Sequence, residues 1–279
     1  MSCSKHSITF NLGVLALAAA MAGCSATGGS GSGAASSGSA DSGVLGALST
    51  LGGNKVGAGV DVFKAVTVSD EDVKSSALQM RAAEDKKLNV ASGNNKYAQR
   101  LAKLTGPYLH EDGMTLNFKV YITRQVNANA TPDGSIRVYS GLMDMMNDQE
   151  MLGVLGHEIG HVKLGHAMSA MRTAYMASAG RKAAASTSSV GGVLAASQLG
   201  ALGEEFVNSQ FSQSQETAAD DYGLAFLKKH GYDGKAMESA LRKLAALDSG
   251  KKSALDGMLS THPDPGKRAD RIHQELAAK

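Results

Sequence analysis

The chain has 279 residues, of which 43% are hydrophobic, and its 28 basic and 26 acidic residues leave a formal net charge of +2. This balance gives no basic stripe of the kind that nucleic-acid-binding proteins carry, so we expect no nucleic-acid partner. Two cysteines are also too few for a structural zinc site built from thiolates.

The first 23 residues have the features of a secretory signal peptide. An apolar run over 8–21 follows a lysine and is too short to span a membrane. It leads into Ala-Met-Ala-Gly-Cys at 20–24, which resembles a bacterial lipobox with methionine in place of the usual leucine. The resemblance implies that Cys24 becomes the lipidated first residue of the mature chain, and that Ser25 after it directs the lipoprotein to the outer membrane. An ordinary secreted protein with a chance cysteine is the alternative.

The amino-acid composition after residue 23 changes near residue 60 and indicates two segments, a tether and a folded domain. Residues 24–60 are the predicted lipidated cysteine and a tether, because the glycine-, serine- and alanine-rich part at 25–53 cannot bury enough apolar surface to fold. Residues 61–279 are long enough for one domain with its own core. Loss of Cys3 with the signal peptide and lipidation of Cys24 would leave no cysteine for a disulfide.

Two helices and two strands are predicted before the chain reaches its most informative motif. Acidic residues after a serine predict a helix from residue 69 to about 90, and a second helix follows over 96–109. Alternating polar and apolar residues predict a strand at 116–122. Pro-Asp-Gly at 132–134 predicts a turn, after which residues 135–139 form a second strand.

A proline-free segment over 147–172 is predicted to form a central helix, since its apolar residues fall on nearly every face. It contains the sequence HExxH. His157 and His161 are four residues apart and therefore lie one above the other, so both imidazoles can bind one ion. Glu158 is rotated by about 100° and can instead reach a water beside that ion.

A catalytic zinc site has three protein ligands and leaves one position for water. Glu216, in a second helix predicted over 204–230, is the candidate third ligand, and Asp220 can accept the free N–H of a ligand histidine. Zinc lowers the pKa of water from about 15.7 to about 7, and Glu158 would pass that proton to the leaving amine. A bare HExxH also fits a helix with two satisfied histidines, but the pair Glu216 and Asp220 argues against this alternative.

The segments 157–161, 216–220 and 260–265 together resemble the signature of the gluzincin zinc metallopeptidases of the HtpX, BepA and LoiP type. The segments 136–146 and 207–213 look most like those of the LoiP-type members. The resemblance covers most of 61–279. It implies an α+β, mainly α, metalloprotease domain in which a small β-sheet lies beside a central HExxH helix, with one zinc ion per chain.

The resemblance also places the loop before the last helix near the metal. It implies that His262 contacts the substrate carbonyl or gates the zinc. Asp264 and Pro265 suit the N-cap and first position of the following helix. Arg268 on that helix can stabilise a developing oxyanion, with an ordinary solvated face as the alternative. Gln213 stands where many members carry an arginine, so the role of that arginine cannot be transferred.

The remaining histidines of the domain have weaker patterns. Five residues separate His166 from His161, so on one continuous helix its ring points about 140° away from the ligand face. A structural or supporting role is expected for it. His110, His230 and His273 have no partner pattern and are expected to face solvent.

One uncharged segment, 183–203, has the length of a membrane span but is too rich in serine and glycine to be one. A mobile loop or a hairpin of small-residue helices beside the active site is expected instead. Residues 135–139 are a hypothetical edge strand with which an extended substrate pairs.

These features predict a lipid-anchored zinc endopeptidase on the periplasmic face of the bacterial outer membrane. Its expected substrates are misfolded or stalled envelope and outer-membrane proteins, and the outer-membrane assembly machinery or a related protease are candidate partners. The alternative is a zinc-containing chaperone or assembly factor with minor proteolysis. An unrelated zinc hydrolase acting on another envelope amide is a third possibility. Glu158 favours a hydrolase, because a purely structural zinc has no use for a base beside it.

Overall fold

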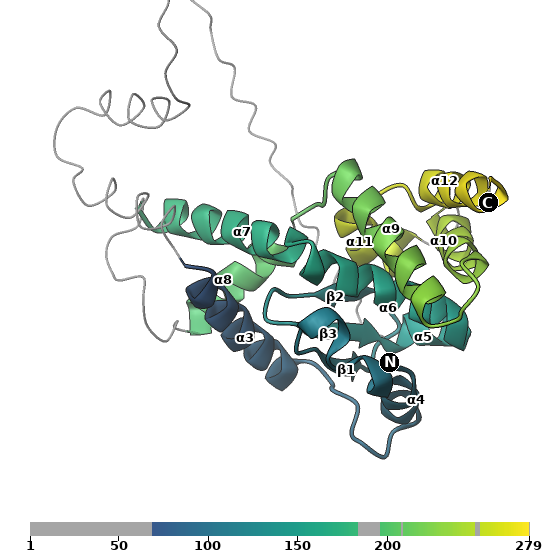
Figure 1. Ribbon diagram of the computed structural model, residues 1–279. Helices are drawn as coiled ribbons and strands as arrows, with labels where there is room; N and C mark the ends of the chain where they lie inside the picture. Colours follow the sequence, from purple (N-terminus) through teal and green to yellow (C-terminus); the bar gives the residue numbers. More distant parts are fainter. Residues whose placement is uncertain (1–68, 184–195, 208, 249–251, 279) are drawn as a thin grey trace, which may run out of the picture. The chain divides into compact units, whose positions relative to one another are not determined.

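A small sheet and the helices around it make up the part of the chain that the computed structural model describes, residues 69–183, 196–207, 209–248 and 252–278 (Figure 1). The helices are α3 Asp70–Lys87, α4 Lys96–Thr105, α5 Ser140–Met145, α6 Asp148–Lys163, α7 His166–Ala183, α8 Ala196–Val207, α9 Gln213–Lys229, α10 Lys235–Asp248, α11 Lys252–Thr261 and α12 Pro265–Ala277. Two short 3₁₀ turns, Gly106–Tyr108 and Glu111–Gly113, follow α4. The predicted class, mainly α with a small β-sheet, is confirmed.

Several predictions concern segments outside the described residues. They are the signal peptide, the lipidated Cys24, the tether, the domain boundary near residue 60 and the middle of 183–203. The described flanks of that last segment are helical, as the end of α7 and the start of α8. Among the described helices, none has both the length and the apolar character needed to cross a membrane.

The sheet has three strands, β1 Asn117–Tyr121, β2 Ala128–Ala130 and β3 Ser135–Tyr139, in the order β1-β3-β2. β3 runs parallel to β1 and antiparallel to β2, so it is the central strand. The hypothesis that residues 135–139 offer a free edge to a substrate is therefore wrong. β2 escaped prediction because it is short and consists of alanine and asparagine, which are poor strand formers.

The turn between β2 and β3 forms where Pro-Asp-Gly predicted it. The Gly134 N–H donates to the Thr131 carbonyl over 3.0 Å, and the φ of Gly134 is +86°. A side chain there would also meet the Thr115 carbonyl, since a Cβ would lie 2.2 Å from that oxygen. Glycine is thus required both by the backbone conformation and by the neighbouring chain.

The predicted central helix over 147–172 is two helices. α6 ends at Lys163, and α7 begins at His166. Gly165 lies between them with a φ of +75°, a conformation that ends helices and that glycine adopts at little cost. The prediction of one helix was wrong because apolar residues continue across the break.

The predicted helix over 204–230 is also divided. α8 ends at Val207, and α9 begins after Ser212. The Ser212 hydroxyl accepts a hydrogen bond from the backbone N–H of Gln215, and the Gln215 side chain accepts one from the Ser212 N–H. This capping box starts α9 shortly before Glu216 and so fixes the direction in which that side chain points.

Close packing between α6 and α9 brings two distant parts of the sequence together. A Cβ on Gly156 would lie 2.9 Å from the Phe226 ring, and one on Gly160 would lie 3.2 Å from the Ala219 carbonyl oxygen. Both glycines therefore permit an approach that a larger residue would prevent. Figure 1 shows α6 next to β2 and α9, with which it makes contacts.

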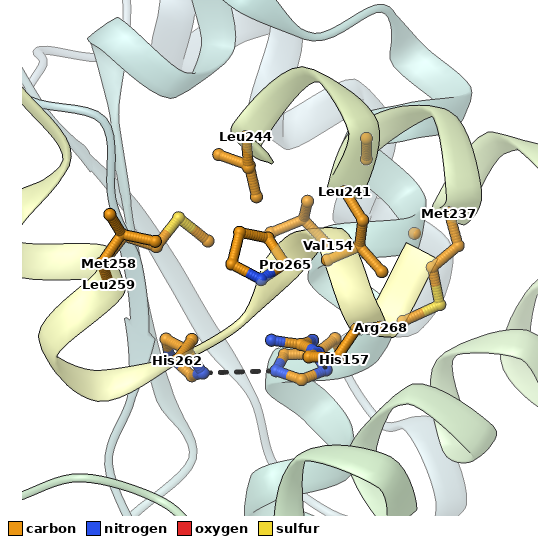
Figure 2. A pocket seen from close by; sticks show the side chains of 12 residues that line it. Val154, His157, Met237, Leu241, Leu244, Met258, Leu259, His262, Pro265 and Arg268 are labelled. Carbon is orange, nitrogen blue, oxygen red and sulfur yellow. Dashed lines mark hydrogen bonds between the residues drawn. The ribbon is translucent and has the colours of Figure 1, made fainter. Parts of the chain in front are cut away.

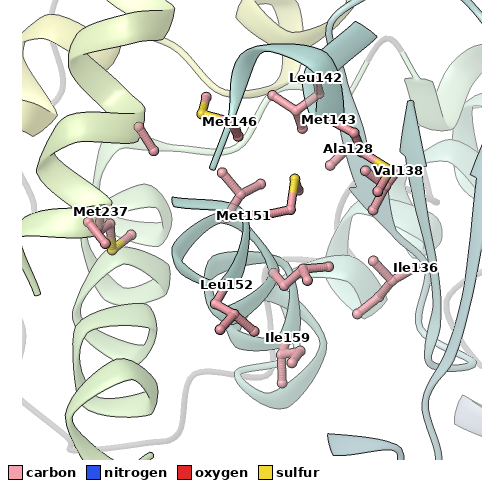
Figure 3. Packing of buried hydrophobic residues seen from close by; sticks show 14 of the residues in the cluster. Ala128, Ile136, Val138, Leu142, Met143, Met146, Met151, Leu152, Ile159 and Met237 are labelled. Carbon is pink, nitrogen blue, oxygen red and sulfur yellow. The ribbon is translucent and has the colours of Figure 1, made fainter. Parts of the chain in front are cut away.

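The hydrophobic core surrounds α6. Figure 3 shows Met151, Leu152 and Ile159 of this helix packed among residues of the sheet, α5 and α10. Met143, Met146 and Met151 are buried in this core, and the partly buried Met145 packs against it. A second cluster joins α3, α7 and α8, and its members are Val73, Ala77, Met80, Met171, Ala174, Tyr175, Leu202 and Phe206.

Candidate metal centre

Four buried side chains direct their donor atoms at one point. They are His157 and His161 from α6, Glu216 from α9 and His262, which follows α11, and their possible ligand atoms all lie within 4.8 Å of one another. The Nε2 atoms of His157 and His161 are 3.0 Å apart, and Glu216 Oε1 lies 3.3 Å from His161 Nε2. Imidazole nitrogens with a carboxylate oxygen are the donors that zinc takes in hydrolases.

Asp220 holds the first of these histidines in place. Its carboxylate accepts the Nδ1–H of His157 over 2.9 Å, which leaves Nε2 facing the other donors. Asp220 is one helical turn after Glu216 on α9, so both carboxylates face α6, as the spacing predicted. A carboxylate on the outer nitrogen of a ligand histidine fixes its tautomer and makes it a stronger donor.

Arg268 lies behind the donors and is tied to both carboxylates. Its Nε donates to Asp220 Oδ2 over 2.9 Å and a terminal nitrogen donates to Oδ1 over 2.5 Å. The other terminal nitrogen pairs with Glu216. With every nitrogen occupied in this way, Arg268 is placed to position the two carboxylates rather than to receive an oxyanion.

Two rings, those of His166 and Phe211, support His161. His166 Nδ1 lies 3.1 Å from His161 Nδ1, because the break at Gly165 turns the chain back toward α6. The expectation that His166 points away from the ligand face is therefore wrong, although its expected supporting role remains. The Phe211 ring stacks on His161 with 3.9 Å between centroids. No local pattern marks Phe211, which lies in the connection between α8 and α9.

His262 lies within the donor group rather than at its border. Its Nδ1 is 3.0 Å from Glu216 Oε1 and 3.3 Å from His157 Nε2. Asp264 occupies the N-cap position of α12, but its φ of 54° is left-handed and its side chain caps no N–H. The predicted positions of Asp264 at the N-cap and Pro265 at the start of α12 are confirmed, although the chain turns sharply here instead of entering α12 from an extended residue.

Beside the donors, Glu158 presents a buried carboxylate oxygen without a hydrogen-bond partner in the described part of the chain. Its residue is 1% exposed, and among the described residues no hydrogen-bond partner reaches Oε1. The nearest cation candidate, His262 Nε2, lies 3.6 Å from that oxygen. A buried carboxylate oxygen without a partner is costly to keep, so this position indicates a group that is paired by a ligand or water.

The electrostatics of Glu216, Asp220 and His161 favour the protonation states that a metal requires. Burial opposes ionisation of Glu216, but the neighbouring histidines hold its pKa well below the usual range. Burial also opposes ionisation of Asp220, and hydrogen bonds from His157 and Arg268 lower its pKa nonetheless. Burial lowers the pKa of His161 well below its ordinary value. At neutral pH the carboxylates are thus ionised and His161 is neutral, as ligands must be.

Three further histidines of the described part of the chain, His110, His230 and His273, lie outside this group. His110 is exposed and the His273 side chain is 64% exposed, as expected. The prediction for His230 is wrong. Its ring packs 4.5 Å from that of Tyr108 and its Nε2 lies 3.2 Å from Glu111 Oε1, because the chain folds the turn after α4 against the end of α9.

Comparison with known proteins agrees with this geometry. Peptidase family M48 matches residues 99–276, which include all four donors and Glu158. Metalloprotease YcaL of Escherichia coli (strain K12) is 42% identical over 224 residues, covering 80% of this chain and 87% of that protein. Metalloprotease LoiP of the same strain is 42% identical over 222 residues, covering 79% and 87%. A beta-barrel assembly-enhancing protease of Yersinia pestis is 33% identical over 158 residues, covering 52% of this chain and 31% of that protein.

The role of Asp220 can be tested against its neighbour. Asp220→Asn should weaken zinc binding by about 10- to 100-fold, because the amide cannot hold His157 and Arg268 as the carboxylate does. Asp221→Asn is the matched control, since that exposed residue pairs with Arg271 on the protein surface. Zinc affinity is measured by competition with a chromogenic chelator. Equal affinities in the two variants would show that Asp220 does not support the metal.

Proposed function

The chain belongs to peptidase family M48 and is a zinc metalloprotease, and on this premise we propose that it is a membrane-tethered endopeptidase of the bacterial periplasm. Its proposed substrates are misfolded or stalled proteins of the envelope and outer membrane. The observation that carries the endopeptidase proposal is the position of Glu158, buried and with one unused carboxylate oxygen beside four convergent metal donors.

Different side chains of the site have different roles in peptide hydrolysis. Zinc, when bound, supplies a Lewis acid that lowers the pKa of water to about 7 and polarises the peptide carbonyl. Glu158 accepts the proton of the attacking water at Oε1 and delivers it to the leaving amine nitrogen. Asp220 and Arg268 keep His157 and Glu216 in position during these steps, and they exchange no proton themselves.

His262 is proposed to act as a gate. A tetrahedral zinc site that hydrolyses a bond keeps one position for water, and His157, His161 and Glu216 supply the other three. In the structure the Nδ1 of His262 lies close enough to these donors to take that fourth position. Hydrolysis then requires the His262 ring to move away, which limits cleavage until a substrate or partner displaces it.

The proposed location rests on the amino-terminal sequence and on the relatives. The signal peptide, the lipobox-like residues before Cys24 and the glycine- and serine-rich tether suit a protein anchored to the outer membrane by lipid. Some of the relatives are named beta-barrel assembly-enhancing proteases, which supports a substrate among outer-membrane proteins. The words assembly-enhancing in these names support keeping the second candidate, a zinc-containing chaperone or assembly factor with minor proteolysis.

Substitution of the proposed base separates the two candidates. Glu158→Gln should lower the rate of casein cleavage at least about 100-fold while zinc stays bound, because the amide cannot accept the proton. Glu150→Gln is the control on the same helix. The Glu150 carboxylate is also buried, but it accepts hydrogen bonds from Ser239 and Lys243 and is not part of the donor group. This variant should retain cleavage. Failure of both zinc-loaded wild type and zinc-loaded His262→Ala to cleave casein would contradict the endopeptidase and favour the assembly factor.

The gate is tested with His262→Ala in the same assay. Loss of this ring frees the fourth zinc position, so cleavage should become faster while zinc remains bound through the other three donors. Metal content is measured alongside the rate. Slower cleavage with full zinc content would assign His262 to substrate contact instead.

The anchor is tested in cells with the full-length chain. Membrane fractionation should place the wild type in the outer membrane, and mass spectrometry should find acyl groups on Cys24. Cys24→Ala should release the protein from that fraction without changing its casein cleavage, because Cys24 lies far before the matched family segment. An unacylated wild type in the soluble periplasm would contradict the proposed location.

A further inference from the structure

A polar cavity beside the metal centre shares Arg268 with the apolar cavity between α6, α10, α11 and α12, where Figure 2 shows Arg268 next to His157. The polar cavity is lined by the start of α9, by Pro263 and Asp264, and by residues of α12. Glu216, one of the metal donors, is part of its wall. An occupant of this cavity therefore lies beside the donor group.

The cavity carries an excess of positive charge, and we call it the cationic cavity. Its cationic lining residues, all from α12, are Lys267, Arg268 and Arg271. The lining carboxylates are Glu216, which pairs with Arg268, and Asp264, which pairs with Lys267 over 3.1 Å. The Lys267 side chain is 79% exposed, and such an exposed pair is weak enough for the ammonium group to turn toward another anion.

Arg271 has hydrogen-bond donors to spare. Its Nη1 pairs with Asp221 over 2.6 Å and with Glu275 over 3.3 Å. Its Nε and Nη2 are buried and find no hydrogen-bond partner among the described residues. Asp220 Oδ2 lies 3.7 Å from Nη2 and already accepts a hydrogen bond from Arg268. Buried nitrogens of a charged group are costly to leave unpaired, so this position indicates a ligand or water.

The unpaired edge of Arg271 has the shape that a carboxylate requires. Nε and Nη2 lie on the same edge of the planar guanidinium, so their N–H groups form a fork that can bind both oxygens of a carboxylate. The side chain is 31% exposed and lines the cavity, which lets this edge turn toward an entering group. The cavity has a volume of about 150 Å³, whereas one water molecule needs about 10–15 Å³, so a carboxylate can enter.

We propose that the cationic cavity is a subsite that binds a carboxylate of the substrate near the cleaved bond, and that Arg271 is the residue that selects it. The inference rests on the proposed endopeptidase function. The carboxylate comes from an acidic side chain or from the free C-terminus of a short substrate. Held next to Glu216, it helps to fix the peptide bond near the donors, because an anchored substrate has fewer orientations to search.

The test compares peptides that differ only in charge. Casein-derived peptides are synthesised with their acidic residues or with the corresponding amides, and each form with a free or an amidated C-terminus. They are cleaved by the full-length, zinc-loaded wild type and by its Arg271→Gln, Arg271→Lys and Arg242→Gln variants. Zinc content and thermal stability are measured for every protein.

Arg242→Gln is the matched control. Like Arg271, Arg242 pairs with two carboxylates near the protein surface, those of Asp270 and Glu238. Arg242 does not line the cationic cavity. Its substitution therefore removes a comparable set of ion pairs and should leave the preference between charged and uncharged peptides as it is in the wild type.

The wild type should cleave the acidic form with a kcat/KM at least about tenfold higher than that of the amide form, the effect of one hydrogen bond to a charged group. The difference should lie mainly in KM, because the carboxylate contacts no reacting atom. Arg271→Gln should bring the ratio close to one. Arg271→Lys should keep part of it, because lysine retains the charge but lacks the fork. A ratio that follows the internal residues assigns a side chain, and one that follows the C-terminus assigns the terminal carboxylate.

Binding is measured separately from cleavage in the zinc-loaded Glu158→Gln variant. Fluorescently labelled peptides in the charged form should bind it about tenfold more tightly than the uncharged forms, as measured by fluorescence anisotropy. Adding Arg271→Gln to this variant should remove the difference.

Failure of the subsite and failure of the proposed function give different results. Equal cleavage and equal binding of charged and uncharged peptides would refute the subsite and leave the endopeptidase intact, and so would an equal loss of preference in Arg271→Gln and Arg242→Gln. A binding preference that depends on Arg271, without cleavage by zinc-loaded wild type or zinc-loaded His262→Ala, would refute the endopeptidase and leave the subsite.

Discussion

The close approach of α6 and α9 is the constraint on which the metal centre depends. Helices with ordinary side chains between them lie about 8–10 Å apart, and the donors come from both of these helices. Gly156 and Gly160 remove the side chains at the contact, so that Phe226 and the backbone of α9 pack directly on α6. As a result Glu216 Oε1 comes within 3.3 Å of His161 Nε2.

That contact also brings two carboxylates into the interior, where their charge must be balanced. Asp220 is 0% exposed and Glu216 2% exposed, and Arg268 from α12 pairs with both. Breaking such a buried group by removing one partner is strongly destabilising, because the remaining charge has no water around it. Asp220 and Glu216 together carry one negative charge more than Arg268 balances, and a divalent cation bound by the donors would compensate it. The side chains of the metal centre therefore hold α6, α9 and α12 together in addition to their role in hydrolysis.

An apolar cavity between α6, α10, α11 and α12 adjoins the metal donors in this arrangement. α6 contributes Val154 to the apolar cavity and, one turn later, His157 to the donor group. The same helix therefore supports both, and a shift that misplaces one misplaces the other. The α12 helix contributes Pro265 to the cavity and Arg268 to the carboxylates in the same way.

The sequence by itself determined the parts of the site that depend on helical spacing. HExxH and the pair Glu216 and Asp220 are each set by residues within one turn, so local geometry fixes which side chains share a face. Only the tertiary structure decided the rest. β3 is central because β1 and β2 pair with its two sides, and His262 enters the donor group from a loop far along the chain. Contacts between segments distant in sequence leave no periodic signal, since they arise from packing.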